Sequence, residues 1–161
     1  MKNYFSILFF TLVLITCTDY DVLAQILDTK QIYLNNCIQI SGEERLVIKT
    51  EDEFLNALRD DANRNNCLQN IEKIDFKANS LIGIGLRTGY CRTPVGLAFE
   101  VEKNRAEKYY GLNIVFIDPR GKVCRTPSKY DLWIIVPKLP ADYEVRFDIK
   151  AVLPKPSDPG I

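Results

Sequence analysis

The amino-acid sequence predicts a mainly β (α+β) fold: an antiparallel β-sandwich or sheet of about seven strands with one packed α-helix near residues 51-64. Apolar and polar residues alternate with a period of two in several segments, which is typical of half-buried strands. A single segment combines a helix start signal with an apolar stripe at helical spacing. An apolar N-terminal run and four further cysteines indicate an exported, disulfide-bonded domain.

The chain begins with a segment that is typical of an export signal. A positively charged start precedes an apolar run from Tyr4 to Cys17, which is too short to span a bilayer with ordinary flanks. Cleavage after Ala24 is favoured because small or aliphatic residues precede it, which makes 1-24 the signal peptide. The alternative is a lipoprotein signal over 1-16, after which Cys17 is lipidated and anchors the domain.

The rest of the chain is the size of one ordinary domain. We expect a single β-rich domain with two disulfides over residues 25-152, followed by an extended Pro-rich tail over 153-161. Lys plus Arg and Asp plus Glu both number 21, so no overall charge would draw the protein to nucleic acid. We expect an exported protein of the periplasm, the outer membrane (as a lipoprotein) or the extracellular space, with membrane contact only through an N-terminal lipid anchor.

Alternating patterns place the strands in chain order. Strands are expected at 46–49, 71–76, 82–86, 97–101, 110–116, 132–136 and 145–149. The fourth and fifth form a hairpin around a turn region at Lys103 to Ala106. In the third strand, Gly83 and Gly85 leave one face almost bare, which suggests a bulge or close approach by another backbone.

The helix is signalled between the first two strands. Thr50 is a fitting N-cap, and Glu53 completes a capping box with it. Phe54 and Leu58 belong to an apolar stripe that would pack on the sheet. The stretch Asn63 to Asn66 has poor helix propensity and is expected to end the helix.

Four cysteines able to pair remain after either cleavage, and an even number in an exported chain predicts two disulfides. The tetrapeptide Cys-Arg-Thr-Pro occurs at 91–94 and again at 124–127. If the strands run up and down as neighbours, the loops that carry these copies emerge at the same end of the sheet. The pairs expected are Cys91-Cys124 and Cys37-Cys67.

The sequence lacks the residues that most kinds of catalytic site require. The chain contains no histidine, so a Ser-His-Asp or Cys-His system and an imidazole metal ligand are excluded. No Cys-x-x-Cys pair is present, so no metal and no cofactor are expected. Glu100 and Glu102 are interpreted as the solvated face of a strand rather than as paired acids. No catalytic residue is assigned, and the protein is not expected to be an enzyme.

The loops that carry the repeated tetrapeptide offer the best candidate binding surface. Arg87, Tyr90, Arg92 and Arg125 provide guanidinium donors beside an aromatic ring on loops that proline and a disulfide would make rigid. The simpler interpretation is that these are ordinary solvated loop residues, with Tyr90 covering the disulfide.

Short phrases in a fixed order carry a resemblance to a known family. They are Val47-Ile48-Lys49, Ile74-Asp75-Phe76, Ser80-Leu81-Ile82-Gly83-Ile84, Thr88-Gly89-Tyr90, Trp133-Ile134-Ile135-Val136-Pro137 and Asp142-Tyr143-Glu144-Val145. In this order the chain resembles the PrcB-like family, named for a protease-complex subunit of the bacterial envelope, over roughly Leu46 to Ala151. The resemblance implies a small β-rich domain, often on an exported lipoprotein, that associates with a protease and stabilises it. It implies no catalytic residues.

The function expected is therefore a non-enzymatic envelope protein that binds another protein, with a protease as the candidate partner. One alternative is an immunoglobulin-like peptidase inhibitor that acts through the Thr88-Gly89-Tyr90 loop. Another is a carbohydrate-binding module that uses Trp133 with Tyr109 and Tyr110, which requires Trp133 to be exposed.

Overall fold

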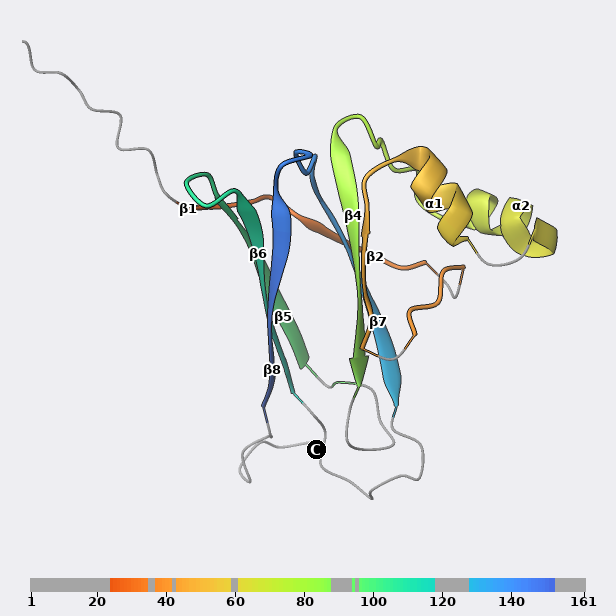
Figure 1. Ribbon diagram of the computed structural model, residues 1–161. Coiled ribbons are helices and arrows are strands. Elements are labelled where there is room, and N and C mark those ends of the chain that lie inside the picture. The colour runs from red at the N-terminus through yellow and green to blue at the C-terminus, as the bar shows by residue number, and fades with distance from the viewer. Residues whose placement is uncertain are drawn as a thin grey trace, which may run out of the picture.

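The computed structural model describes residues 24–34, 37–41, 43–58, 61–87, 94, 96–117 and 128–152 (Figure 1). The strands are β1 (Ala24–Ile26), β2 (Lys30–Ile32), β3 (Arg45–Ile48), β4 (Asn79–Arg87), β5 (Gly96–Asn104), β6 (Tyr109–Ile117), β7 (Lys129–Pro137) and β8 (Glu144–Val152). The helices are α1 (Glu51–Ala57) and α2 (Asp61–Asn70). None of the helices in these ranges is long and apolar enough to cross a membrane.

The strands form two four-stranded sheets that pack face to face. The first sheet has the order β1-β5-β6-β8, and the second has the order β2-β7-β4-β3. Neighbouring strands are antiparallel except β6 and β8, which are parallel. The mainly β, sandwich-like α+β class is thus confirmed, but one strand pair departs from the antiparallel expectation.

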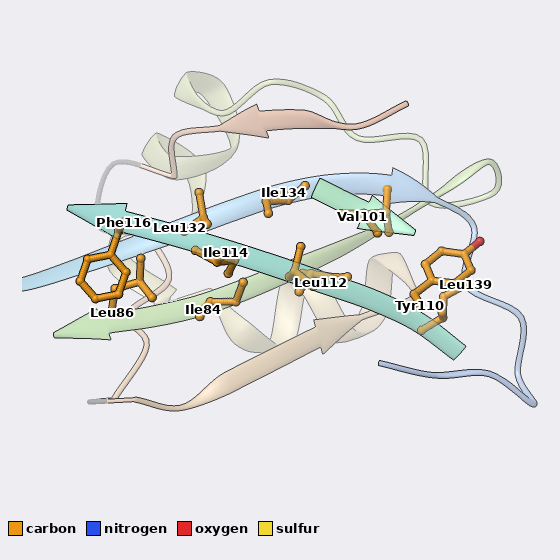
Figure 2. Close-up of a cluster of buried hydrophobic side chains, with 12 residues drawn as sticks. Ile84, Leu86, Val101, Tyr110, Leu112, Ile114, Phe116, Leu132, Ile134 and Leu139 are labelled. Carbon is orange, nitrogen blue, oxygen red and sulfur yellow. The ribbon is translucent and has the colours of Figure 1, made fainter. Parts of the chain in front are cut away.

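Between the two sheets lies the main hydrophobic core (Figure 2). The first sheet contributes Val101, Tyr110, Leu112, Ile114 and Phe116, and the second contributes Ile82, Ile84, Leu86, Leu132, Ile134 and Val136. Within each strand these residues are two apart, as the pleat of a strand requires. Tyr110 is buried, and its hydroxyl donates to the carbonyl of Lys138 at 3.2 Å.

A second hydrophobic cluster covers the opposite face of the second sheet. Figure 1 shows both helices on this side, away from the first sheet. Leu81 and Trp133 point outward from the sheet and pack with Phe54 and Leu58 of the α1 region. The described residues therefore form three layers, in which the helices cover the outer face of the second sheet.

The structure contains two helices where the sequence predicted one near residues 51-64. The capping box is confirmed, because Thr50 accepts from the Glu53 N–H and Glu53 accepts from the Thr50 N–H. Leu58 then takes an extended conformation, with φ −63° and ψ 132°, and ends α1. Its side chain is buried in the second cluster, so burial of Leu58 stabilises this break.

The stretch expected to end the helix instead lies inside α2. Asn66 is followed by Cys67, which is buried and forms a disulfide with Cys37 in the second cluster. Asn70 donates from its side chain to the backbone carbonyl of Asn66 at 2.8 Å. These tertiary and local contacts outweigh the low helix propensity of asparagine.

The strand expected at 71–76 does not form. Ile74 and Phe76 pack irregularly against the second cluster, and the Phe76 ring lies 5.4 Å from that of Phe54. The backbone then turns at Asp75, whose carbonyl accepts from the N–H of Asn79.

The part of the chain that the structure describes holds eight strands rather than about seven. β1 and β2 each have three residues, which is too short for a period of two to be recognised. The predicted hairpin is confirmed as β5 and β6, but β4 does not pair with it. β4 pairs with β3 and β7 in the other sheet.

Candidate functional site

Ends of β4, β5, β6 and β7 lie at one end of the sandwich, which we call the Arg87 end, and β8 also ends there, with Val152 opposite Ile117. β4 ends at Arg87 opposite Lys129, where β7 begins. In the other sheet β5 begins at Gly96 opposite Ile117, where β6 ends. The connections over 88–95 and 118–128 therefore both join one sheet to the other at this end. The sequence predicted a shared end correctly, but assumed neighbouring strands of a single sheet.

Of the residues predicted to bind a partner, Arg87 is described and is exposed. Tyr90, Arg92 and Arg125 lie outside the described residues. The predicted Cys91-Cys124 disulfide and the Thr88-Gly89-Tyr90 loop also fall there. We therefore define the Arg87 end by the strand ends that flank the segments 88–95 and 118–128.

Two positive charges lie directly opposite each other at the Arg87 end. Arg87 and Lys129 are cross-strand partners and both are exposed. Within the described ranges neither has a carboxylate within ion-pair distance, and the nearby Asp131 carboxylate accepts weakly from the Ile40 N–H at 3.5 Å. Like charges at directly opposed positions destabilise a sheet. This end therefore presents positive charge that an acidic surface would neutralise.

At the other end of the sandwich, cations are neutralised by the chain itself. The Arg146 guanidinium lies 4.1 Å from the Tyr109 ring centroid and also contacts Glu107 and Glu144. Hydrogen bonds to those carboxylates, Glu107 first, raise the pKa of Arg146. In the structure these cations have carboxylate partners, whereas Arg87 and Lys129 have none among the described residues.

An aromatic pair holds a further cation at that end. The Lys103 ammonium lies 5.2 Å from the Tyr143 ring centroid and 5.8 Å from that of Tyr110. The two rings meet edge to face at 5.9 Å, and burial raises the pKa of Tyr110. The arrangement is a packed structural cluster, because the Tyr110 ring belongs to the main core.

A groove of about 840 Å³ opens beside the helices. Its lining is formed by α1, α2, the segment 71–77 and Lys138. The Lys138 ammonium donates to the carbonyls of Lys49 and Phe76, which ties the residue that follows β7 to both walls. Sequence reasoning missed the groove because residues 71–76 were predicted to form a strand. No local pattern marks these contacts, since the bonded residues are 62 and 89 positions apart.

The aromatic residues proposed for carbohydrate binding are mostly inaccessible. Trp133 is 2 % exposed and Tyr110 is 1 % exposed. Trp133 packs under the helices in the second cluster, so it presents no open ring face. This removes the side chain on which the carbohydrate alternative depended.

The two glutamates considered as paired acids differ in environment. Glu100 is exposed, whereas Glu102 is half-buried beside Gly111 and lies 3.5 Å from the Tyr109 hydroxyl. Among the described residues, no group of three or more His, Cys, Asp or Glu side chains is placed to hold a metal ion.

Comparison of the chain with family models, with curated proteins and with solved structures found no match. Function is therefore inferred from the chemistry of the surfaces themselves. The Arg87 end combines two opposed cations that have no carboxylate partner among the described residues with the strand ends that flank both copies of the repeated tetrapeptide.

Proposed function

We propose that this protein is a non-enzymatic envelope protein that binds an acidic surface of another protein through the Arg87 end. The observation that carries the proposal is the opposed pair Arg87 and Lys129, which has no carboxylate partner in the described part of the chain. A guanidinium can bind a carboxylate through two parallel hydrogen bonds, and the neighbouring ammonium adds a point charge. A bound acidic side chain would relieve the repulsion between the two cations.

The sequence supplies further residues of this kind close to the Arg87 end. Tyr90 and Arg92 follow Arg87 closely in the sequence, and Arg125 shortly precedes Lys129. An aromatic ring among arginines is the composition found at the energetic centre of many protein interfaces. We therefore place Tyr90, Arg92 and Arg125 in the same binding surface as Arg87.

Export and the class of partner complete the proposal. The Cys37–Cys67 disulfide is typical of an oxidising compartment, which supports an exported protein. The resemblance to the PrcB-like family points to a protease as the partner that is accompanied or stabilised. Positive charge at the Arg87 end then requires that the partner offer carboxylates at its contact surface.

Affinity capture from envelope extract tests the proposal. The wild-type protein, a variant with Arg87→Ala and Lys129→Ala, and a variant with Arg92→Ala and Arg125→Ala would be cross-linked to their neighbours and the captured proteins quantified. We expect one acidic partner that each double variant recovers at least about tenfold less, and whose capture weakens with added salt. Direct binding of that purified partner to the three proteins must show the same order.

A matched control changes charges at the opposite end. Arg105→Ala with Lys108→Gly also removes one arginine and one lysine, and glycine accommodates the positive φ of 55° at Lys108. This variant should capture the partner like the wild type. Equal recovery by all variants, or equal loss in the control, would refute the binding surface assigned here.

A further inference from the structure

The four outer edges of the two sheets are unequal in length. β1, β2 and β3 have three, three and four residues, whereas β8 is an edge strand of nine residues (Figure 1). β8 contains no proline or glycine that would interrupt it. Long, regular edge strands readily pair with another strand, and proteins usually shorten or block them. This edge is therefore the natural place for association.

The backbone groups that β8 leaves unpaired can be assigned from its register. The N–H of Glu144 donates to the carbonyl of Lys108, and β8 runs parallel to β6 from the Tyr109–Glu144 pair onward. In such a ladder the even-numbered residues of β8 bond to β6, and the odd-numbered ones point away. The N–H and C=O groups of Val145, Phe147 and Ile149 therefore face an edge that no strand in the described part of the chain covers.

Charges alternate in sign along the outer face of β8. Glu144, Arg146, Asp148 and Lys150 are all exposed and follow one another two residues apart. In this structure Arg146 pairs with Glu144 at 2.5 Å and with Glu107 of the β5–β6 turn at 2.6 Å, and Lys150 pairs with Asp148 at 2.7 Å. Exposed pairs of this kind contribute little and exchange partners readily.

This alternation is self-complementary in one antiparallel register. When two copies of β8 meet about a two-fold axis at Phe147, Arg146 lies opposite the partner's Asp148, and Glu144 lies opposite the partner's Lys150. A shift of two residues in either direction places Arg146 opposite a partner arginine or lysine instead. A shift of one residue places apolar positions opposite charged ones. Both the charges and the pleat therefore select the register centred on Phe147.

The inner face fits the same register. Val145, Phe147 and Ile149 are half-buried at the margin of the main core, and the Arg45 guanidinium covers the Phe147 ring at 4.8 Å. Pairing about Phe147 sets the two Phe147 rings opposite each other and Val145 opposite the partner's Ile149. These residues are also the ones whose backbone groups face the open edge, so hydrogen bonding and apolar contact agree.

We propose that two copies of this protein associate through β8, in antiparallel register about Phe147, to form one continuous sheet across the dimer. Arg146 and Asp148 set the register, because they fall at a position without direct hydrogen bonds, where opposed side chains lie closest. Arg87 and Lys129 lie in the second sheet, which does not contain β8, so each copy keeps its proposed partner-binding surface.

Charge reversal tests the register directly. The full chain, expressed with its own leader and purified as the cell processes it, would be studied by analytical ultracentrifugation over a range of concentrations. We expect a reversible dimer that Arg146→Asp and Asp148→Arg each weaken at least about tenfold, because each change sets like charges opposite one another twice per dimer. Mixing the two variants should restore association, since every opposed pair is then of opposite sign.

Controls and a second measurement guard against nonspecific effects. Arg105→Asp in the β5–β6 turn and Glu100→Arg on the outer face of β5 reverse exposed charges away from the edge and should leave the dimer unchanged. Amide exchange at Val145, Phe147 and Ile149 should slow as the wild-type concentration rises. A protein that stays monomeric, a mixture that does not associate, or exchange independent of concentration would each overturn the proposal.

Discussion

The indole ring of Trp133 occupies the space where a side chain at Gly83 would lie. The two residues are cross-strand partners in β4 and β7, and a Cβ atom built on Gly83 would meet Cζ3 of Trp133 at 2.3 Å. The face of β4 that seems bare in the sequence is thus covered by an aromatic side chain from the neighbouring strand. Gly83 is required because Trp133 is buried and has no open space into which to move.

Gly83→Ala should lower the free energy of unfolding by about 1–3 kcal/mol, because the new methyl group overpacks the second cluster. Urea denaturation of the variant measures the loss. Gly96→Ala is the comparison, since its Cβ would lie 3.0 Å from the mobile tip of Ile117, and we expect a smaller effect. In a Trp133→Leu background, Gly83→Ala should lower the free energy of unfolding by less. An equal loss in that background would show that the indole ring does not cause the destabilisation.

Loss of the Cys37–Cys67 disulfide should destabilise the protein by about 3 to 4 kcal/mol in the chain-entropy model, since the bond spans 30 residues. Both cysteines are buried where α2 meets the second cluster, so α2 should be the first element to loosen. Denaturation of the variant with Cys37→Ser and Cys67→Ser measures the loss. Adding a reductant to this variant measures any effect of reduction other than loss of the Cys37–Cys67 bond. A variant as stable as the wild type would contradict the prediction.

Cys91 and Cys124 should be joined by a disulfide, because the connections that carry them begin and end at the Arg87 end. Trypsin digestion of the non-reduced protein should yield residues 88–92 linked to residues 123–125, and reduction should separate the two peptides. Free thiols at both positions, or either cysteine linked to Cys37 or Cys67, would contradict the prediction.

Ser80→Ala should destabilise the protein by about 1–3 kcal/mol, because the mutation leaves a buried donor without a partner. The Ser80 hydroxyl is fully buried and accepts from the Leu139 N–H at 3.0 Å. Thermal unfolding measures the loss, and faster amide exchange at Leu139 should accompany it. Unchanged exchange at Leu139 would indicate that this hydrogen bond does not stabilise the chain turn after β7.

Lys108 and Asp142 should affect the titration of each other. A hydrogen bond from Lys108 lowers the pKa of Asp142 below its ordinary 3.8, and the same bond raises the pKa of Lys108. Asp142 therefore stabilises the folded protein at a pH above its unfolded pKa. This stabilisation is lost as the pH falls through the lower pKa that Asp142 has in the folded protein. Carboxyl titration by NMR should show the pKa of Asp142 rising in Lys108→Asn. An unchanged pKa would mean that the ion pair at 2.8 Å does not persist in solution.

Local patterns predicted those elements whose residues lie close together in the sequence. The capping box joins residues three apart, and the β5–β6 hairpin joins strands that are adjacent in the sequence; both are confirmed. The same patterns failed at 71–76, where alternating apolar residues pack beneath the helices without a strand partner. A period of two shows which side of a segment is apolar, but not whether an unoccupied sheet edge is available to it.

The two candidate surfaces could be recognised from the sequence only in part, because each also depends on which strands pair. Arg87 was recognised in the sequence, but its opposition to Lys129 follows from the pairing of β4 with β7. The alternating charges of β8 are visible in the sequence as a solvated strand face. Only the parallel pairing with β6 shows that this strand ends a sheet and leaves Val145, Phe147 and Ile149 with open backbone groups.

By itself the sequence determined the residues of each long strand that face the main core, the start of α1 and the mainly β class, because side-chain periodicity and capping are local properties. Tertiary structure decided which strands pair, where Leu58 ends α1, and how Lys138 joins distant segments around the groove. Several strands offer similar apolar faces, so local patterns leave their partners open. The choice depends on the summed burial and hydrogen bonding of surfaces far apart in the chain, as the fit of Trp133 over Gly83 illustrates.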